Sequence, residues 1–558
     1  MHINFWKNRE ILTPEQKKER HKERLLLILS GFLLGISFPP FPFPFQLFMF
    51  FGLVPYFYVI EKKTTLIEIN RSSYLAFFVF SLITLYWVGS WQKDADPFLM
   101  ISGVLLIFVN PLILLIPSTL FYFLRKIFPG KTALYFFPLL WVTYEYAYMI
   151  TDLSFPWLTL GSGLAHFTAF IQIADIIGTL GLSLVVVLIN VLVYKVFIKY
   201  ISTRKISFYN LAAVIFIYSF VLLYGFIKID AFHLSGRKIR VGLIQPNINP
   251  WAKWDVGSLN DFVKLYLNYS RKAVNEGAKF IVWPETALPV YLLSGGYNDA
   301  LDSIYNFVRN NDVYLMTGMP DIRYYHKGEK MPIGVKFSEN LGYYATYNAI
   351  YLFSPDTRAV QRYGKMKLVP FGERVPFVDQ LPFLGKIIRW GVGITGWNVG
   401  KDTILFKIKD KELSNANVND TVKIDGLVCY ESIFPIFVSE FVRKGAQFIT
   451  VVTNDSWYGN SSGPYQHKEM SVLRAVENRR SVIRAANGGI SCIIDPLGRT
   501  IIHSQMFTRT FLVGDVILQD NGTFFTKHAY LVPIICSVFS IWVIGMFILL
   551  WLKRMFKL

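Results

Sequence analysis

The sequence predicts a bundle of about eight membrane-spanning helices joined to a soluble α/β domain, because apolar windows of about 17 to 25 residues recur along the chain. The composition supports a membrane protein, since 53% of the 558 residues are hydrophobic and 17% are aromatic. Residues 237–520 differ from the rest, because they mix charges, turns and short strands. That stretch is therefore predicted to be soluble.

The apolar windows divide the chain into domains. They begin near Leu25, Phe45, Ser73, Phe98, Ala133, Thr168, Tyr209 and Ala529. Seven windows precede the soluble stretch and one follows it. The predicted parts are a basic N-terminus at 1–24, a seven-helix membrane domain at 25–228, a soluble domain at 237–520, a last span at 529–552 and a tail at 553–558.

The positive charge indicates which loops face the cytoplasm. The net charge is +19, and 20 Lys and Arg with only six acids gather in 1–24, 61–71, 125–132, 195–205 and 553–558, at alternate ends of the windows. The positive-inside rule makes these segments cytoplasmic. Seven spans then bring residues 237–520 to the outer face. Because the charge is explained by topology, we expect no nucleic-acid partner.

Within 237–520, short strands alternate with amphipathic helices. The stretch "KIRVGLIQPNI" reads as a strand, "SLNDFVKLYLNYSRKAVNEG" as a helix, and "AKFIVWPET" as a buried strand that runs into a proline turn. The cycle repeats with a helix near 298–310, strands in "VYLMTGMP" and "YYATYNAIYLFSP", and strand–helix pairs that begin at "GLVCYES" and "QFITVVTND". Two more strands, "GISCIIDPLGRTI" and "TFLVGDVIL", close the domain. This order predicts a layered α/β sandwich.

Three polar residues follow predicted strands, where ligands bind in open α/β sheets. They are Glu285 in "WPET", Lys365 in "YGKMKLVPFGE" and Cys429 in "GLVC". In a nucleophilic site, the glutamate takes the thiol proton, the lysine favours the thiolate and the oxyanion, and the cysteine attacks an acyl carbon. The backbone N–H of Tyr430 is a second candidate oxyanion donor. Taken alone, Cys429 is also explained as a small buried hydrophobic residue.

The motifs resemble those of a known superfamily. In this order, "WPETA", "YGKMKLVPFGE", "VCYES" and "TNDSWYG" resemble the nitrilase superfamily of carbon–nitrogen hydrolases, whose triad falls on Glu285, Lys365 and Cys429. That resemblance implies an α-β-β-α sandwich. The stretch "LVPFGE", the Cys-Tyr-Glu order and the seven-plus-one spans look more specifically like the apolipoprotein N-acyltransferase family, over essentially the whole chain.

The narrower resemblance implies a ping-pong acyl transfer at the periplasmic face of a bacterial inner membrane. Cys429 attacks the sn-1 ester of a phospholipid, typically phosphatidylethanolamine, and leaves a thioester and a lysophospholipid. The free α-amine of a diacylglyceryl apolipoprotein then takes the acyl chain. We expect no cofactor, no metal and a monomer.

The resemblance also implies residues that support the triad or bind substrate. They are the acids Glu373 and Glu431, the pocket-lining aromatic residues Trp254, Tyr430 and Trp457, and Asn454 at a strand end beside the cysteine. Alternatives stay open for some of them. The two acids are also explained as structural ion pairs, and the two tryptophans as core residues.

Residue spacing leaves two choices open. In an extended segment Lys367 shares a face with Lys365, and the family position favours Lys365. His467 in "YQHKEM" invites interpretation as a base for the cysteine, but the polar start of a helix explains it and Glu285 already fills that role.

The apolar stretch 375–399 fits neither the strand nor the helix pattern, and we expect a mobile surface loop. It is either an insertion that covers the domain or, as the resemblance favours, a lid. The lid residues would be Phe383 and Trp390, which would enter the bilayer and gate the acyl chain.

Two other functions compete with acyl transfer. In a membrane-anchored nitrilase-type amidase, water would resolve the acyl-enzyme, but a large membrane platform serves no purpose for a soluble amide. A transporter would need ionisable residues within its spans, where Glu145 and Asp175 are the few candidates. Acyl transfer between two lipid substrates accounts for the whole chain.

Overall fold

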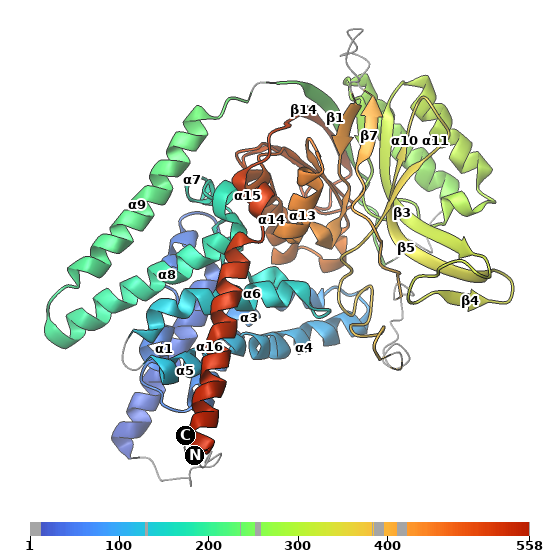
Figure 1. The fold of residues 1–558 in the computed structure, drawn as a ribbon. Helices are drawn as coiled ribbons and strands as arrows, with labels where there is room; N and C mark the ends of the chain where they lie inside the picture. Colours follow the sequence, from blue (N-terminus) through green and yellow to red (C-terminus); the bar gives the residue numbers. More distant parts are fainter. Residues whose placement is uncertain are drawn as a thin grey trace.

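The structure is a computed structural model that describes residues 13–128, 132–234, 236–251, 258–381, 383, 396–409 and 421–556. Figure 1 shows a helical bundle with two packed sheets at one end of it. The predicted pocket residue Trp254 and the predicted lid residue Trp390 lie outside the described residues.

The bundle is built from long helices linked by short ones. Its α-helices are α1 (Pro14–Ile36), α2 (Val54–Ile60), α3 (Leu66–Leu85), α4 (Pro97–Ile113), α5 (Leu115–Ile127), α6 (Phe137–Ile150), α7 (Thr168–Ile171), α8 (Ala174–Thr203), α9 (Phe208–Ala231) and α16 (Leu531–Met555). Short 3₁₀ helices lie between them: η1 (Phe45–Phe50), η2 (Tyr86–Gly89), η3 (Ala133–Phe136), η4 (Pro156–Leu158) and η5 (Leu160–Leu164). Figure 1 shows that α16 begins near α15 (Phe524–His528) and runs down along the bundle, where it packs on α5 and α6.

Five helical stretches of the described chain are long and apolar enough to cross a membrane: Leu66–Gly89, Pro97–Ile127, Ala174–Thr203, Phe208–Ala231 and Leu531–Lys553. They confirm a membrane bundle, and the count of eight stays a prediction. Of the other predicted windows, the one near Leu25 is the apolar second half of the 23-residue α1, whose first half is charged, and two form shorter or interrupted helices. The window near Phe45 is split into η1 and α2, and α6 has 14 residues.

The soluble part contains two main sheets. The first has the order β14 (Thr510–Ile517), β1 (Lys238–Gln245), β2 (Phe280–Val282), β3 (Tyr314–Tyr325), β5 (Gly342–Phe353), β4 (Lys336–Ser338), with β6 (Gln361–Gly364) also paired to β5. The second has the order β13 (Thr500–His503), β12 (Cys492–Ile494), β11 (Val482–Ala486), β10 (Ile449–Thr453), β9 (Leu427–Val428). A separate hairpin pairs β7 (Phe406–Lys409) with β8 (Thr421–Ile424).

Helices cover both outer faces of the two sheets, which confirms the α-β-β-α sandwich. They are α10 (Leu259–Asn275) and α11 (Asn298–Asn310) on the first sheet, and α13 (Pro435–Arg443), α14 (Ser462–Asn478) and α15 (Phe524–His528) on the side that faces the bundle (Figure 1). Alternation along β1 explains the layers. Val241 packs with Val428 between the sheets, whereas Ile244 packs in the cluster under α10 and α11.

Buried hydrogen bonds join α14 to the bundle. The Gln466 side-chain oxygen accepts from the indole N–H groups of Trp87 at 3.1 Å and Trp157 at 2.7 Å. The amide nitrogen of the same side chain donates to the carbonyl oxygens of Pro39 and Thr84. Because every polar atom of this buried amide is paired, the orientation of the sandwich on the bundle is well determined.

The two acids that a transporter would need have structural partners instead. Asp175 forms an ion pair with Arg479 of the soluble part at 2.8 Å. Glu145 accepts from the backbone N–H of Leu160 at 2.8 Å and from the indole N–H of Trp141 at 2.8 Å. Both therefore tie segments of the molecule together.

Candidate active site

Cys429 lies where β9 ends and the short 3₁₀ helix η7 (Cys429–Ile433) begins. Its φ of +50° falls in the left-handed region, which residues other than glycine rarely adopt. The Cys429 carbonyl oxygen accepts from Ser432 Oγ at 2.7 Å, and His467 Nε2 lies 3.1 Å from it. These contacts hold a strained turn that fixes the direction of the thiol.

A buried cluster of two carboxylates and a lysine forms the polar part of the site. Glu285 follows β2, and Lys365 follows β6 and is 1% exposed. Lys365 Nζ lies 2.8 Å from Glu373 Oε1 and 3.4 Å from Glu285 Oε1. The two carboxylates compensate the cost of burying the ammonium group.

The two lysines of "KMK" point to different places. Lys365 enters the carboxylate cluster, whereas Lys367 Nζ lies over the Phe434 ring, 5.4 Å from its centroid, and lines another pocket. The bent backbone between them removes the shared face that an extended segment would give. Geometry therefore favours Lys365 as the lysine of the predicted triad.

Asn348, in the middle of β5, connects the two carboxylates. Its side-chain N–H groups donate to Glu285 Oε1 at 2.8 Å and to Glu373 Oε1 at 3.0 Å. The backbone carbonyl oxygen of Asn348 accepts from the backbone N–H of Lys365 at 2.8 Å. One residue thus orients all three charged groups. The sequence analysis missed Asn348, because nothing in its strand sets it apart from a structural residue.

Burial and charge set the protonation of the site. Burial raises the pKa of Glu285, and the nearby Glu373 raises it further while Lys365 lowers it. Burial alone would lower the pKa of Lys365, but the carboxylates of Glu373 and Glu285 raise it overall. Lys365 is therefore a permanent cation. A Glu285 carboxylate with a raised pKa is a better proton acceptor than an ordinary one.

The surroundings of the Cys429 thiol act on its pKa in opposite directions. Burial raises the pKa of Cys429 and the charge of Glu285 raises it further, which outweighs the lowering by Lys365. The resting group is therefore a protonated thiol. A nucleophilic role for this thiol would therefore need a base to take its proton, and the charges of Glu285 and Lys365 both act on it.

Glu431 and Glu373 hold the loop that carries the lysine. Glu431 Oε1 accepts from the Tyr363 hydroxyl at 2.6 Å and from the backbone N–H of Met366 at 2.6 Å, and burial raises its pKa to about 7. Its Oε2 accepts from the backbone N–H of Val428 at 2.8 Å. Glu431 thus connects the Cys429 strand to the Lys365 loop, a positioning contact rather than a simple ion pair.

A small apolar cavity opens beside Cys429. Tyr430 lines it, and the Tyr430 hydroxyl donates to the Ser154 carbonyl oxygen of the bundle at 2.6 Å. Phe155 and Tyr458 line it as well. Since one wall comes from the bundle and another from the sandwich, the thiol lies at the boundary between the two parts.

Three of the predicted site residues remain to be placed: Asn454, Trp457 and Phe383. Asn454 follows β10 and its side-chain oxygen accepts from Asn487 at 3.1 Å. Trp457 packs edge-on against Trp251, with ring centroids 4.8 Å apart, while its neighbour Tyr458 lines the cavity. Phe383 is 54% exposed. Their roles stay predictions.

The sequence suggested the polar start of a helix for His467, but α14 begins at Ser462 and His467 is 3% exposed beside Cys429. Its Nδ1 lies 2.9 Å from Asp455 Oδ1, and Asp455 is ion-paired to the buried Arg484. Ligand atoms of Cys429, Asp455 and His467 lie within 4.8 Å of one another, but the adjacent guanidinium opposes binding of a cation. The arrangement supports the Cys429 turn.

Replacing Asn348 with alanine is expected to slow acylation of Cys429 by about 10- to 100-fold, because hydrogen bonds to charged groups contribute roughly 1.5–3 kcal/mol. Single-turnover acylation followed by mass spectrometry measures the rate. The exposed Asn306→Ala in α11 is the matched control. An unchanged rate in Asn348→Ala would show that the carboxylates need no such bridge.

Comparison with known proteins adds to this geometry. The carbon–nitrogen hydrolase family model matches residues 240–524, and a second model, the apolipoprotein N-acyltransferase N-terminal domain, matches residues 30–192. A protein of Chlorobaculum tepidum named apolipoprotein N-acyltransferase is 34% identical, over 92% of this chain and 94% of its own. Proteins of that name from Geobacter metallireducens (32% identical, 93% of this chain, 94% of theirs) and Rickettsia prowazekii (30%, 93% and 97%) match similarly.

Proposed function

The chain belongs to the apolipoprotein N-acyltransferase family, and from this premise we propose that it moves an acyl chain from a phospholipid to the N-terminal amine of a diacylglyceryl apolipoprotein through Cys429. It is an acyltransferase, and the amidase alternative is not favoured. The donor we propose is phosphatidylethanolamine, which gives up its sn-1 chain. The protein needs no cofactor and works as a monomer.

In the first half-reaction, the sulfur of Cys429 attacks the carbonyl carbon of the ester while Glu285 takes the thiol proton. The tetrahedral intermediate carries a negative oxygen, which the Lys365 ammonium and the backbone N–H of Tyr430 stabilise. Collapse breaks the ester C–O bond, and Glu285 returns the proton to the leaving oxygen. A thioester and a lysophospholipid result.

In the second half-reaction, the apolipoprotein amine attacks the thioester carbon. Glu285 takes a proton from the attacking nitrogen and delivers it to the departing sulfur of Cys429. The C–S bond breaks, an amide forms, and the free thiol is restored. A thioester is reactive enough for this step, because sulfur is a better leaving group than an alkoxide oxygen.

The observation that carries this proposal is the buried cluster of Glu285, Lys365 and Glu373, in which the charges of Glu285 and Lys365 act on a thiol held in a strained turn. The bundle beside it supports delivery of two lipid substrates from the membrane. We assign 1–24 and 553–558 to the cytoplasm, and 237–520 to the periplasmic side of the inner membrane. The stretch 375–399, with Phe383 and Trp390, acts as the lid.

The fate of the acyl-enzyme separates transfer from hydrolysis. Purified protein is first acylated with phospholipid and then mixed with a diacylated lipopeptide, either with a free amine or with an N-acetylated one. The free amine is expected to discharge the thioester and appear as a triacylated product, whereas the N-acetylated peptide leaves it intact. Equal discharge by water in both mixtures would instead support the amidase alternative.

A further inference from the structure

The hairpin formed by β3 and β5 has an exposed tip, residues 323–343, which includes β4. Figure 1 shows this hairpin tip projecting below the other strands of the sandwich in this view, in the direction in which the bundle lies. Ile333 is 69% exposed and Phe337 is 63% exposed, the two highest values among the large apolar side chains of the described soluble part. Apolar side chains gathered at a surface in this way indicate a contact with another molecule.

Strand pairing holds these side chains in a fixed arrangement. Phe337 of β4 lies directly opposite Tyr343 of β5, and their ring centroids are 4.9 Å apart. Tyr343 and Leu341 are exposed as well. Because the paired strands already order the rings, binding to them costs little conformational entropy. The hairpin tip is therefore a preformed apolar surface.

Basic residues accompany the apolar ones. The hairpin tip has two acids, Glu329 and Glu339, and four basic residues, Arg323, Lys327, Lys330 and Lys336. Among the residues that the structure describes, none of these four has an ion-pair partner. Arg323 lies over the Tyr325 ring, and Lys336 donates to the hydroxyl of Thr346. Cations beside exposed apolar and aromatic side chains are typical of segments that bind the surface of an anionic membrane.

The buried Asn398 joins the hairpin tip to the described end of the stretch 375–399. Its side-chain N–H donates to the carbonyl oxygen of Ile333 at 3.0 Å, and its side-chain oxygen accepts from the backbone N–H of Thr346 at 3.1 Å. The backbone N–H of Asn398 donates to the carbonyl oxygen of Thr346 at 2.7 Å. The hairpin tip is therefore fixed beside the stretch that we propose as the lid.

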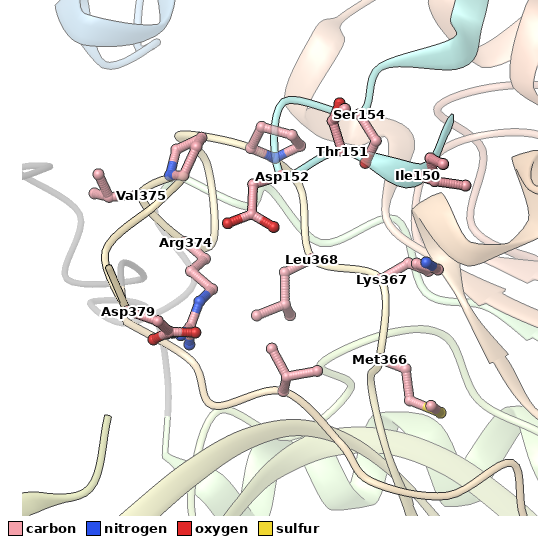
Figure 2. Close-up of a pocket in the computed structure, with 13 residues that line it drawn as sticks. Ile150, Thr151, Asp152, Ser154, Met366, Lys367, Leu368, Arg374, Val375 and Asp379 are labelled. Carbon is pink, nitrogen blue, oxygen red and sulfur yellow. Dashed lines mark hydrogen bonds and ion pairs between the residues drawn. The ribbon is translucent and has the colours of Figure 1, made fainter. Parts of the chain in front are cut away.

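That stretch in turn lies against the end of a bundle helix. The backbone N–H of Phe377 donates at 3.2 Å to Oδ2 of Asp152, in the loop that follows α6. Figure 2 shows this loop beside the side chains of Arg374 and Asp379, which form an ion pair. Arg374 also donates to the carbonyl oxygen of Trp397 at 3.3 Å. Contacts thus run from the hairpin tip to a helix end, where the hydrocarbon of a membrane gives way to head groups.

We propose that the hairpin tip, residues 323–343, lies on the outer surface of the membrane and binds anionic phospholipid there. Ile333 and Phe337 enter the interface, while Lys327 and Lys330 contact lipid phosphates. None of these residues takes part in acyl transfer, so the surface goes beyond the proposed function. It holds the sandwich in one orientation on the bilayer, in addition to the contacts of α14 with the bundle.

Photo-cross-linking of the full chain tests this contact. The photoreactive residue p-benzoylphenylalanine is placed at position 337, and the protein is reconstituted in nanodiscs of phosphatidylcholine with or without phosphatidylglycerol. Irradiation is expected to attach phospholipid to the peptide that contains position 337, with a yield about fivefold higher when phosphatidylglycerol is present. The double variant Lys327→Gln/Lys330→Gln should lose this increase. The matched control carries the photoreactive residue at the exposed position 306 of α11, in the layer farthest from the bundle, and should give no lipid adduct (Figure 1).

A lipid yield at position 337 no higher than at position 306 would overturn the membrane contact and leave the proposed function in place. Cross-links from position 337 to a second copy of the chain would overturn it as well, because the patch would then join two copies. Equal yields with and without phosphatidylglycerol would overturn the binding of anionic lipid. Thermal unfolding of each variant is expected to match that of the wild type, since all the changed positions are exposed, and this separates lost contact from lost folding.

Discussion

Cys429→Ala is expected to abolish N-acylation of a diacylated lipopeptide, with a loss of about 10⁴-fold or more, because no other group in the described site can carry the acyl chain. The carboxylate cluster does not depend on the thiol, so Glu285, Lys365 and Asn348 should keep their contacts. Thermal unfolding of the variant in detergent is expected to match that of the wild type. Product formation is measured by mass spectrometry of the lipopeptide.

Cys492 provides the matched control. It is a fully buried free cysteine in β12 of the same sandwich. Cys492→Ala should keep activity within about twofold at a temperature where it is folded, since only packing is lost. Substantial turnover by Cys429→Ala, or equal losses in the two variants, would contradict the assignment of Cys429 as the nucleophile.

Glu285→Gln is expected to slow acylation of Cys429 by about 10²- to 10⁴-fold, the range in which a positioned general base contributes. Asn348 can still donate to the glutamine oxygen, so the geometry of the cluster is kept. The loss has a chemical cause. The thiol has a raised pKa, so it needs a base, and the variant lacks the carboxylate that we assign to that role.

The pH dependence of the acylation rate tests the role of Glu285 in a second way. Only the ionised carboxylate accepts a proton, so the acylation rate of the wild type should fall as the pH drops through the pKa of Glu285. Burial raises that pKa, so the fall should begin above the ordinary range of a glutamate. Glu285→Gln should lose this limb, and the exposed Glu276→Gln should keep it. If the fall of the acylation rate at low pH persists in Glu285→Gln, the titrating group is not Glu285.

The layers of the sandwich follow from local sequence patterns. The alternation of charged and apolar residues at the start of β1 and the capping box of Ser258 and Asp261 at α10 are short-range signals, so both elements were predictable. The pairing of β14 with β1 is not local, because residues about 270 positions apart meet there and no pattern within either strand specifies the partner. The breaks in the bundle helices are also set by packing, which hydropathy does not report.

The residues of the site also divide into those that the local sequence indicates and those that only long-range packing brings together. Glu285, Lys365 and Cys429 follow strands, and that position made them candidates before any contact was known. Asn348 lies within a strand, and His467 is buried between Asp455 of the sandwich and the Trp157 ring of the bundle. Neither the role of Asn348 nor the burial of His467 can be predicted from the local sequence. The raised pKa of the Cys429 thiol likewise depends on its burial in the folded protein, which the local sequence does not report.

The acyl-thioester on Cys429 is the step on which every other role depends, and mass spectrometry of the wild-type protein incubated with phosphatidylethanolamine alone tests it most directly. The expected result is a mass increase of one acyl chain on the peptide that contains Cys429, together with one equivalent of lysophospholipid. The adduct should be removed by hydroxylamine at neutral pH, as a thioester is. No adduct on wild-type protein, or the same adduct on Cys429→Ala, would contradict the mechanism.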